Sequence, residues 1–131
     1  MNTRAVRGTV LVVDDSEIAC ESAKHTLGEA GFEVVTLTSP FGFIKAIRES
    51  RPAVILVDVG LGILNGGKLV VLGRQHARAS CKIVLYSSRD ASLLAQDVAS
   101  SGADGYITKS TTGDAFVKAV ERWVGVLHHR Q

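Results

Sequence analysis

The chain has 131 residues, of which 46% are hydrophobic and 21% are charged, and its formal net charge is +2. This composition is typical of a soluble globular protein, and the length suits one domain with its own core. So small a net charge gives no support for direct binding of nucleic acid or of an anionic membrane. Two cysteines without metal or redox spacing, no signal peptide and no bilayer-length apolar stretch predict a cytoplasmic protein that does not insert into membranes.

Short apolar runs rich in branched residues predict buried strands, and a stretch with helical periodicity follows each of them. The predicted strands cover residues 9–13, 32–37, 54–57, 82–86 and 105–108. The predicted helices begin at Ser16, at Ser39-Pro40, at Lys68, after Asp90 and near Thr111, where Asp114 suggests a capping box. This alternation predicts an α/β fold with a mostly parallel sheet and helices on both faces.

Polar residues follow four of these strands, and they indicate where a ligand binds. In parallel α/β sheets, ligands collect beyond the carboxyl ends of the strands, where the strand order reverses. The polar residues at the strand ends are Asp14, Asp15, Asp58, Ser87, Ser88 and Lys109. A carboxylate at the end of a buried strand is costly without cations or donors beside it. Because like charges this close need a divalent cation, the sequence predicts an acidic pocket that binds Mg²⁺ through carboxylates, a backbone carbonyl and water.

Each of these features has a plainer interpretation when it is taken singly. Asp14-Asp15 is typical of a turn followed by a helix cap, Ser87-Ser88 of a loop, and Lys109 of a solvated surface charge. Tyr106 alone is most often packed. The joint arrangement, with every group at a predicted strand end, favours the acidic pocket. The histidines do not share in this pattern, and Trp123 is interpreted as core or edge packing.

From about Thr9 to Leu127 the chain resembles a response-regulator receiver domain, the module of two-component signalling. The matching stretches are Val-Val-Asp14-Asp15, Leu-Val-Asp58, Val-Leu-Tyr-Ser87-Ser88 and Gly102-Ala-Asp-Gly-Tyr106-Ile-Thr-Lys109. Asp15, Asp58, Ser87 and Lys109 follow one another at separations of 43, 29 and 22 residues. The resemblance implies a flavodoxin-like (βα)5 fold with strand order 2-1-3-4-5. It also implies a single receiver domain over residues 1–131 without an output domain, similar to stand-alone chemotaxis regulators.

The resemblance also implies a role for the acidic residues. Asp58 would be the phosphoacceptor, which takes a phosphoryl group from a sensor histidine kinase, a histidine phosphotransfer protein or a small acyl phosphate. Asp15, Asp58 and the carbonyl of Gly60 would bind Mg²⁺ directly, and Asp14 would act mainly through bound water. The metal would neutralise charge on the transferred group. In this view the chain is not an enzyme, because it catalyses only its own phosphorylation and dephosphorylation.

Three further residues would connect phosphorylation to a signal. Lys109 would pair with Asp58 and then with the phosphoryl oxygens. Ser87 would move its hydroxyl toward the phosphate, and Tyr106 would turn inward to fill the vacated space. This movement would bias a two-state surface formed by the fourth helix, the fifth strand and the fifth helix, which would contact a downstream protein target.

The chain departs from the usual family pattern at three positions. Gly62 stands where the family usually has Pro four residues after the phosphoacceptor, and Gly60 offers no side chain to shield or orient an attacking water. Ser110 stands where a Pro usually follows the lysine. A cis bond before Ser costs about 2.5–4 kcal/mol, so we predict a trans bond. The glycines predict a mobile loop, and these departures leave open a phosphorylation that is altered, slow or absent.

Two other functions compete with this interpretation. Residues 62–68 match the phosphate-binding pattern G-x-x-x-x-G-K between a strand and a helix, but they lack the final Ser or Thr that would bind Mg²⁺. A nucleotide-binding enzyme would need Lys68 for ATP binding. The second alternative is a receiver-like docking module that acts without phosphorylation, in which case partner binding would survive Asp58→Asn.

Overall fold

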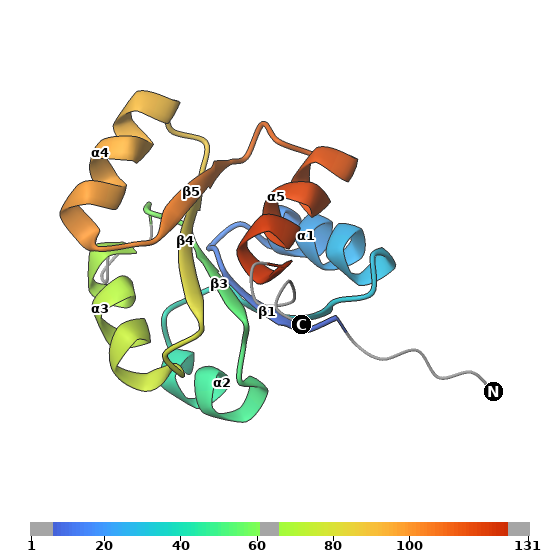
Figure 1. Ribbon diagram of the computed structural model, residues 1–131, viewed down its shortest axis with the longest axis horizontal. Coiled ribbons are helices and arrows are strands. Elements are labelled where there is room, and N and C mark those ends of the chain that lie inside the picture. Colours follow the sequence, from blue (N-terminus) through green and yellow to red (C-terminus); the bar gives the residue numbers. More distant parts are fainter. Residues whose placement is uncertain (1–6, 61–65, 126–131) are drawn as a thin grey trace.

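The architecture is a five-stranded parallel sheet between two layers of helices (Figure 1). The computed structural model describes residues 7–60 and 66–125. Within these ranges the strands are β1 Thr9–Val13, β2 Glu33–Leu37, β3 Val54–Val57, β4 Lys82–Ser87 and β5 Gly105–Thr108. The helices are α1 Glu17–Glu29, α2 Phe43–Ser50, α3 Gly66–His76, α4 Ala91–Ser101 and α5 Gly113–Gly125. The strand order is β2-β1-β3-β4-β5, which confirms the predicted fold class and order.

The sheet is buried on both faces because its central strands consist of branched apolar residues. Alternate residues of β1 point to opposite faces, so that Val10 and Val12 belong to one core and Leu11 and Val13 to the other. The first core packs under α1 and α5, and the second under α2, α3 and α4. None of the helices in the described ranges is long and apolar enough to cross a membrane.

Two glycines allow helices to approach the sheet closely. A Cβ on Gly73 of α3 would lie 2.8 Å from the side chain of Ile83 in β4, so the helix continues through this glycine and packs tightly there. A Cβ on Gly105 of β5 would overlap the ring of Trp123 in α5. Trp123 is half-buried against the first core, as its interpretation as core or edge packing predicted.

The helix starts follow the sequence signals less faithfully than the strands do. α1 begins at Glu17, one residue after the predicted Ser16, and Ser16 is its N-cap, since its hydroxyl accepts a hydrogen bond from the Ala19 N–H at 3.1 Å. The predicted start of α2 at Ser39-Pro40 is wrong. Ser39 accepts instead from the Phe41 N–H within a turn, and Gly42 has a left-handed backbone (φ 83°) that delays the helix to Phe43.

The starts of α3 and α5 differ from the predictions by about two residues, whereas the start of α4 agrees. α3 begins at Gly66, two residues before the predicted start at Lys68, and it ends at His76. α4 begins directly after Asp90, as predicted, and Asp90 occupies its N-cap position without a capping hydrogen bond to its side chain. The capping box at Thr111 is wrong, since α5 begins at Gly113 and the Thr111 hydroxyl lies 3.1 Å from that of Thr108. At Thr111 the contact with Thr108 takes the place of the predicted cap.

Candidate functional site: an acidic pocket at the carboxyl edge of the sheet

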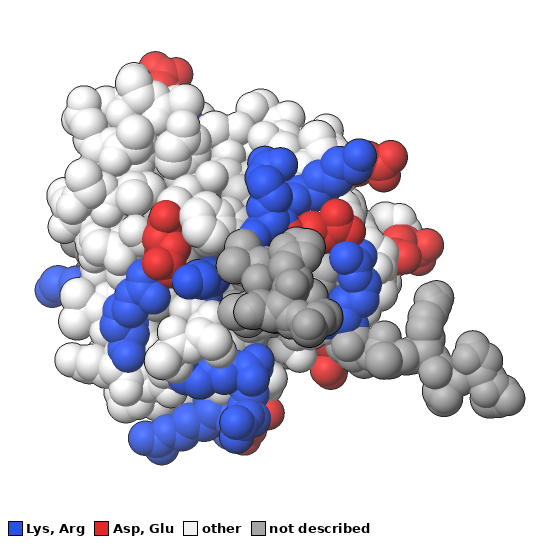
Figure 2. Space-filling view, viewed as in Figure 1, with Lys and Arg blue, Asp and Glu red and all other residues white. Residues whose placement is uncertain are grey.

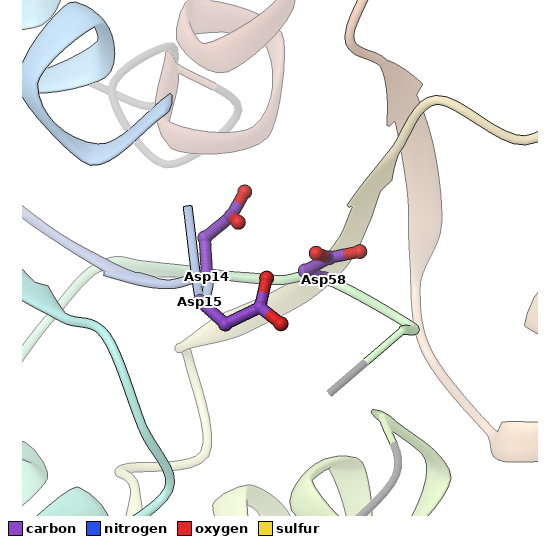
Figure 3. A group of neighbouring side chains, drawn as sticks. All are labelled: Asp14, Asp15 and Asp58. Carbon is purple, nitrogen blue, oxygen red and sulfur yellow. The ribbon is translucent and has the colours of Figure 1, made fainter. Parts of the chain in front are cut away.

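The three aspartates predicted to form the pocket come together because their strands are neighbours. Val13, the last residue of β1, is the register partner of Val57, the last residue of β3. Asp14 and Asp15 follow β1, and Asp58 follows β3 (Figure 3). One carboxylate oxygen from each residue lies within 4.8 Å of the others. The parallel pairing of β1 and β3 is therefore what gathers these carboxylates.

The aspartates differ in burial and in their hydrogen bonds. Asp14 is 0% exposed and Asp58 is 8% exposed, whereas Asp15 is open to solvent. Asp14 Oδ1 accepts a hydrogen bond of 2.9 Å from the backbone N–H of Ser16. Asp58 Oδ1 accepts one of 3.1 Å from the backbone N–H of Gly60. Each buried carboxylate thus has one of its oxygens satisfied by the turn that follows it.

Lys109 supplies a cation to the pocket from the end of β5. Its backbone N–H donates to the carbonyl of Ser87 at 2.8 Å, which continues the pairing of β5 with β4. Its ammonium Nζ lies 2.6 Å from Asp14 Oδ2 and 3.6 Å from Asp58 Oδ2. The lysine thus contacts both buried carboxylates, and Asp14 is the closer of the two. The described residues contain no cis peptide bond, so the bond before Ser110 is trans as predicted.

The electrostatics of the pocket follow from burial. Burial raises the pKa of the Asp58 carboxyl, and the negative charge of Asp14 raises it further. The hydrogen bond from the Gly60 N–H and the positive charge of Lys109 lower this pKa, but by less. For Lys109, burial favours the neutral amine, but its contacts with Asp14 and Asp58 outweigh burial and raise its pKa. Among the described residues of the cluster, three carboxylates face one ammonium, and two negative charges are left over. A small divalent cation with a preference for oxygen ligands matches that excess charge.

Two pocket neighbours were not singled out by sequence reasoning. Tyr86 forms an aromatic wall, with its ring centroid 5.5 Å from Lys109 Nζ and stacked on Phe116 at 5.3 Å. Cys20 donates its thiol to the carbonyl of Asp14 at 3.3 Å, and burial raises its pKa. Tyr86 directly precedes Ser87 at a strand end, and that position is the signal that could have identified it. Both cysteines of the chain are free.

The two predicted switch residues, Ser87 and Tyr106, lie on the neighbouring strands β4 and β5. The Ser87 side chain is nearly buried, and its hydroxyl accepts a hydrogen bond of 3.2 Å from the backbone N–H of Arg89. Tyr106 is 37% exposed on β5. It lines a surface cavity of about 400 Å³ that also contacts Lys118, Arg122 and Trp123 of α5. The hydroxyl is therefore engaged in a turn, and the tyrosine is open to solvent.

Several predicted features lie partly or wholly outside the described residues. Gly62 and most of the candidate phosphate-binding pattern belong to residues 61–65, so the predicted mobility of this loop stays a prediction. Lys68 is exposed in the first turn of α3. Leu127 and the histidine pair near the carboxyl terminus are also outside the described ranges.

The fold and the pocket together define a class of protein: a doubly wound α/β domain with a carboxylate cluster at the edge where ligands bind. The family model of the response regulator receiver domain matches residues 10–121. The chain therefore belongs to the response regulator receiver domain family, which confirms the resemblance seen in the sequence.

Comparisons with individual proteins agree with this assignment. The chain is 30% identical over 108 residues to the transcriptional regulatory protein KdpE of Mycobacterium tuberculosis, covering 82% of this chain but only 47% of that protein. It is 27% identical over 116 residues to Protein PilG of Pseudomonas aeruginosa, covering 88% and 86% of the two chains. Among solved structures, the chemotaxis response regulator CheY4 of Vibrio cholerae aligns with a TM-score of 0.76 at 25% identity, covering 88% of this chain and 97% of that one. The chain thus spans about half the length of the first of these relatives.

Proposed function

We propose that this chain is a phosphoacceptor signalling module that takes a phosphoryl group onto Asp58. The observation that carries the proposal is the position of this nearly buried carboxylate, 3.6 Å from Lys109 and within a cluster that includes Asp14 and Asp15. Response regulator receiver domains receive phosphoryl groups from histidine kinases. A sensor histidine kinase or a histidine phosphotransfer protein is accordingly the proposed donor, and a downstream protein is the proposed target.

The proposed transfer uses groups that the structure brings together. An oxygen of Asp58 forms a bond to phosphorus while the phosphorus–nitrogen bond of a phosphohistidine breaks, and the imidazole leaves with that electron pair and takes up a proton. Lys109 neutralises charge on the phosphoryl oxygens. Because Lys109 already contacts Asp14, it can approach the phosphoryl group without leaving its nearest partner. These contacts favour transfer by placing charge in advance.

The pocket also fits the magnesium ion that this chemistry needs. Its side-chain ligand atoms are carboxylate oxygens, which Mg²⁺ prefers. Asp15 is open to solvent, so an ion can reach the pocket. We propose that Asp15, Asp58 and the carbonyl of Gly60 hold Mg²⁺ directly and that Asp14, engaged by Lys109 and the Ser16 N–H, acts through water. Bound Mg²⁺ would neutralise charge on the transferred group.

The proposed output is a change on the surface formed by α4, β5 and α5. Ser87 would exchange its hydrogen bond from the Arg89 N–H for one to the phosphoryl group. Tyr106 is exposed, and it would turn inward when Ser87 moves. The cavity beside Tyr106, lined by Lys118 and Arg122, would change shape with that turn. We propose that the chain acts as one receiver domain in the cytoplasm and signals by this contact.

The test is the intact mass of the protein after incubation with acetyl phosphate and Mg²⁺. We expect one phosphoryl adduct in the wild type, none in Asp58→Asn and none after chelation of the metal. Asp90→Asn is the matched control, because Asp90 is an exposed aspartate without a capping hydrogen bond and its loss should leave the adduct intact. Retained Mg²⁺ binding with no adduct would contradict the proposal and favour the phosphate-independent docking module. Loss of Mg²⁺ binding as well would contradict the acidic pocket itself.

A further inference from the structure

The amino edge of the sheet carries a second cavity, at the opposite ends of the strands from the acidic pocket. Its volume is about 300 Å³, and it lies between the last turns of α2 and α3. Ile47, Pro52 and Ala77 form its apolar part. Arg51 precedes β3 and Arg78 precedes β4, which places the cavity at the amino ends of these two strands. The phosphoryl-transfer groups of the acidic pocket take no part in it.

The polar side chains that the described residues contribute to this cavity are basic. Three guanidinium groups, from Arg48, Arg51 and Arg78, line it together with His76, and no carboxylate of the described ranges does. Figure 2 shows Lys and Arg side chains gathered over the lower part of the molecule, around α2 and the adjacent end of α3 as placed in Figure 1, with little acidic surface between them. We call this cavity the basic cleft.

The arginines of the basic cleft differ from Arg7, Arg74 and Arg89 in their ion pairing. Arg7, Arg74 and Arg89 each pair with a carboxylate, at 2.7, 2.8 and 3.0 Å respectively. Within residues 7–60 and 66–125, none of the arginines of the basic cleft forms an ion pair with a carboxylate. Arg78 donates instead to the backbone carbonyl of Arg51 at 3.1 Å. Their positive charges are therefore available to a ligand.

The negative ends of the helix dipoles offset only part of this positive charge. The carboxyl ends of α2 and α3 point toward the cleft, and basic residues in the last turn of a helix neutralise its negative end. Each helix end carries the equivalent of about half a negative charge. Two helix ends therefore balance about one guanidinium, and the cleft has three. An excess of positive charge remains, and it faces a concave surface.

The cleft is also partly organised before any ligand binds. Arg51 has a left-handed backbone (φ 49°), held by a hydrogen bond of 2.9 Å from its N–H to the carbonyl of Ile47. Its carbonyl binds the guanidinium of Arg78, so residues from the ends of α2 and α3 are tied together. Groups that are already positioned lose less conformational freedom when a ligand binds.

We propose that the basic cleft binds a small molecule with a diphosphate group. Guanidinium groups bind phosphate oxygens in pairs of parallel hydrogen bonds, and several arginines around one cavity suit a multiply charged oxyanion. A volume of about 300 Å³ admits a diphosphate with a small organic substituent. The apolar residues of the cleft offer a contact for that substituent. This proposal does not depend on phosphorylation of Asp58.

The test is isothermal titration of the full chain, at low ionic strength and without Mg²⁺, with inorganic pyrophosphate and with ADP as probes. We expect one saturable site in the wild type and weaker binding by about tenfold in Arg48→Gln, because one charge-assisted phosphate contact is lost. Arg48 is exposed in the last turn of α2, so this variant should fold normally, which its thermal melt will check. Tighter binding of ADP than of pyrophosphate would assign the apolar part of the cleft to the organic group, and equal binding would assign recognition to the diphosphate alone.

Two control variants distinguish the basic cleft from diffuse surface charge and from the acidic pocket. Lys45→Gln removes the same charge from the same helix but from a residue outside the cleft, and it should leave the affinity unchanged. Asp58→Asn should also leave it unchanged, because the phosphoacceptor lies at the other edge of the sheet. The proposal is overturned if neither probe binds at millimolar concentration. It is equally overturned if Lys45→Gln weakens binding as much as Arg48→Gln, since that result indicates diffuse surface charge.

Discussion

The two edges of the sheet hold charged groups in opposite ways. At the carboxyl edge, Asp14 and Asp58 are buried and share one lysine, whereas at the amino edge the arginines of the basic cleft are exposed to solvent. Buried charges depend strongly on one another, because water cannot replace a missing partner. Exposed charges are screened by solvent and salt, so each can change with little consequence for folding. The comparison therefore predicts large effects of substitution on stability at one edge and small effects at the other.

The largest effect should come from removing the lysine of the acidic pocket. Lys109→Met leaves Asp14 and Asp58 buried without its ammonium, and breaking a buried ion pair from one side costs about 3 kcal/mol in unfolding free energy. Urea unfolding at neutral pH will measure this loss, which should shrink in acid as the carboxylates take up protons. Lys118→Met, which changes an exposed lysine of α5, is the control. A cost below about 1 kcal/mol at neutral pH, the level of an exposed pair, would contradict the distinction between the edges.

Magnesium should stabilise the protein through the same pocket. A ligand that binds only the folded state adds about 2.7 kcal/mol to the unfolding free energy at a hundred times its dissociation constant. We expect the melting temperature of the wild type to rise with Mg²⁺ and to return to its starting value on chelation. Asp15→Asn should remove most of this rise, because Asp15 is the solvent-open carboxylate of the cluster. An equal rise in that variant would exclude Asp15 as a ligand.

Removing one of the buried carboxylates should raise the unfolding free energy, whereas removing the lysine should lower it. Because burial raises the pKa of Asp58, the folded state holds this proton more tightly than the unfolded chain does. The stability of the wild type should therefore fall as pH rises from below the ordinary aspartate pKa through the raised one. Asp58→Asn cannot ionise, so without Mg²⁺ its unfolding free energy should exceed that of the wild type at neutral pH. Unfolding curves between acidic and neutral pH will show whether the difference appears over that window.

Asp90→Asn serves as the control for that comparison, since it removes an exposed carboxylate without a capping hydrogen bond. Its unfolding free energy at neutral pH should show no comparable increase over the wild type. A destabilised Asp58→Asn would contradict the sign of the prediction, and it would mean that the contact with Lys109 outweighs the cost of burial.

The smallest effect should come from the amino edge. Arg78→Gln removes a hydrogen bond to the Arg51 carbonyl, but it also relieves repulsion among three neighbouring guanidinium groups. We expect a change in unfolding free energy of about 0.5 kcal/mol or less, as is usual for exposed positions. The same urea titrations will measure it. A loss as large as that of Lys109→Met would show that the basic cleft is part of the folding core.

The sequence by itself determined the strands and the polar residues at their ends. Three of the strands, β1, β3 and β5, have the predicted bounds, because short runs of branched apolar residues are a local signal. Since all the strands are parallel, residues that follow them share one edge, and this rule is enough to predict the cluster of Asp14, Asp15 and Asp58.

Only the tertiary structure decided which of these groups touch and which other residues join them. The closer contact of Lys109 with Asp14 than with Asp58 depends on how β5 meets the rest of the sheet. The delayed start of α2 depends on a left-handed Gly42, which a serine-proline signal does not reveal. Arg48 and Arg78 are distant in the chain, and they line one cavity because α2 and α3 pack against each other. Periodicity and strand ends are local properties, whereas contacts between helices require the packing of the whole domain.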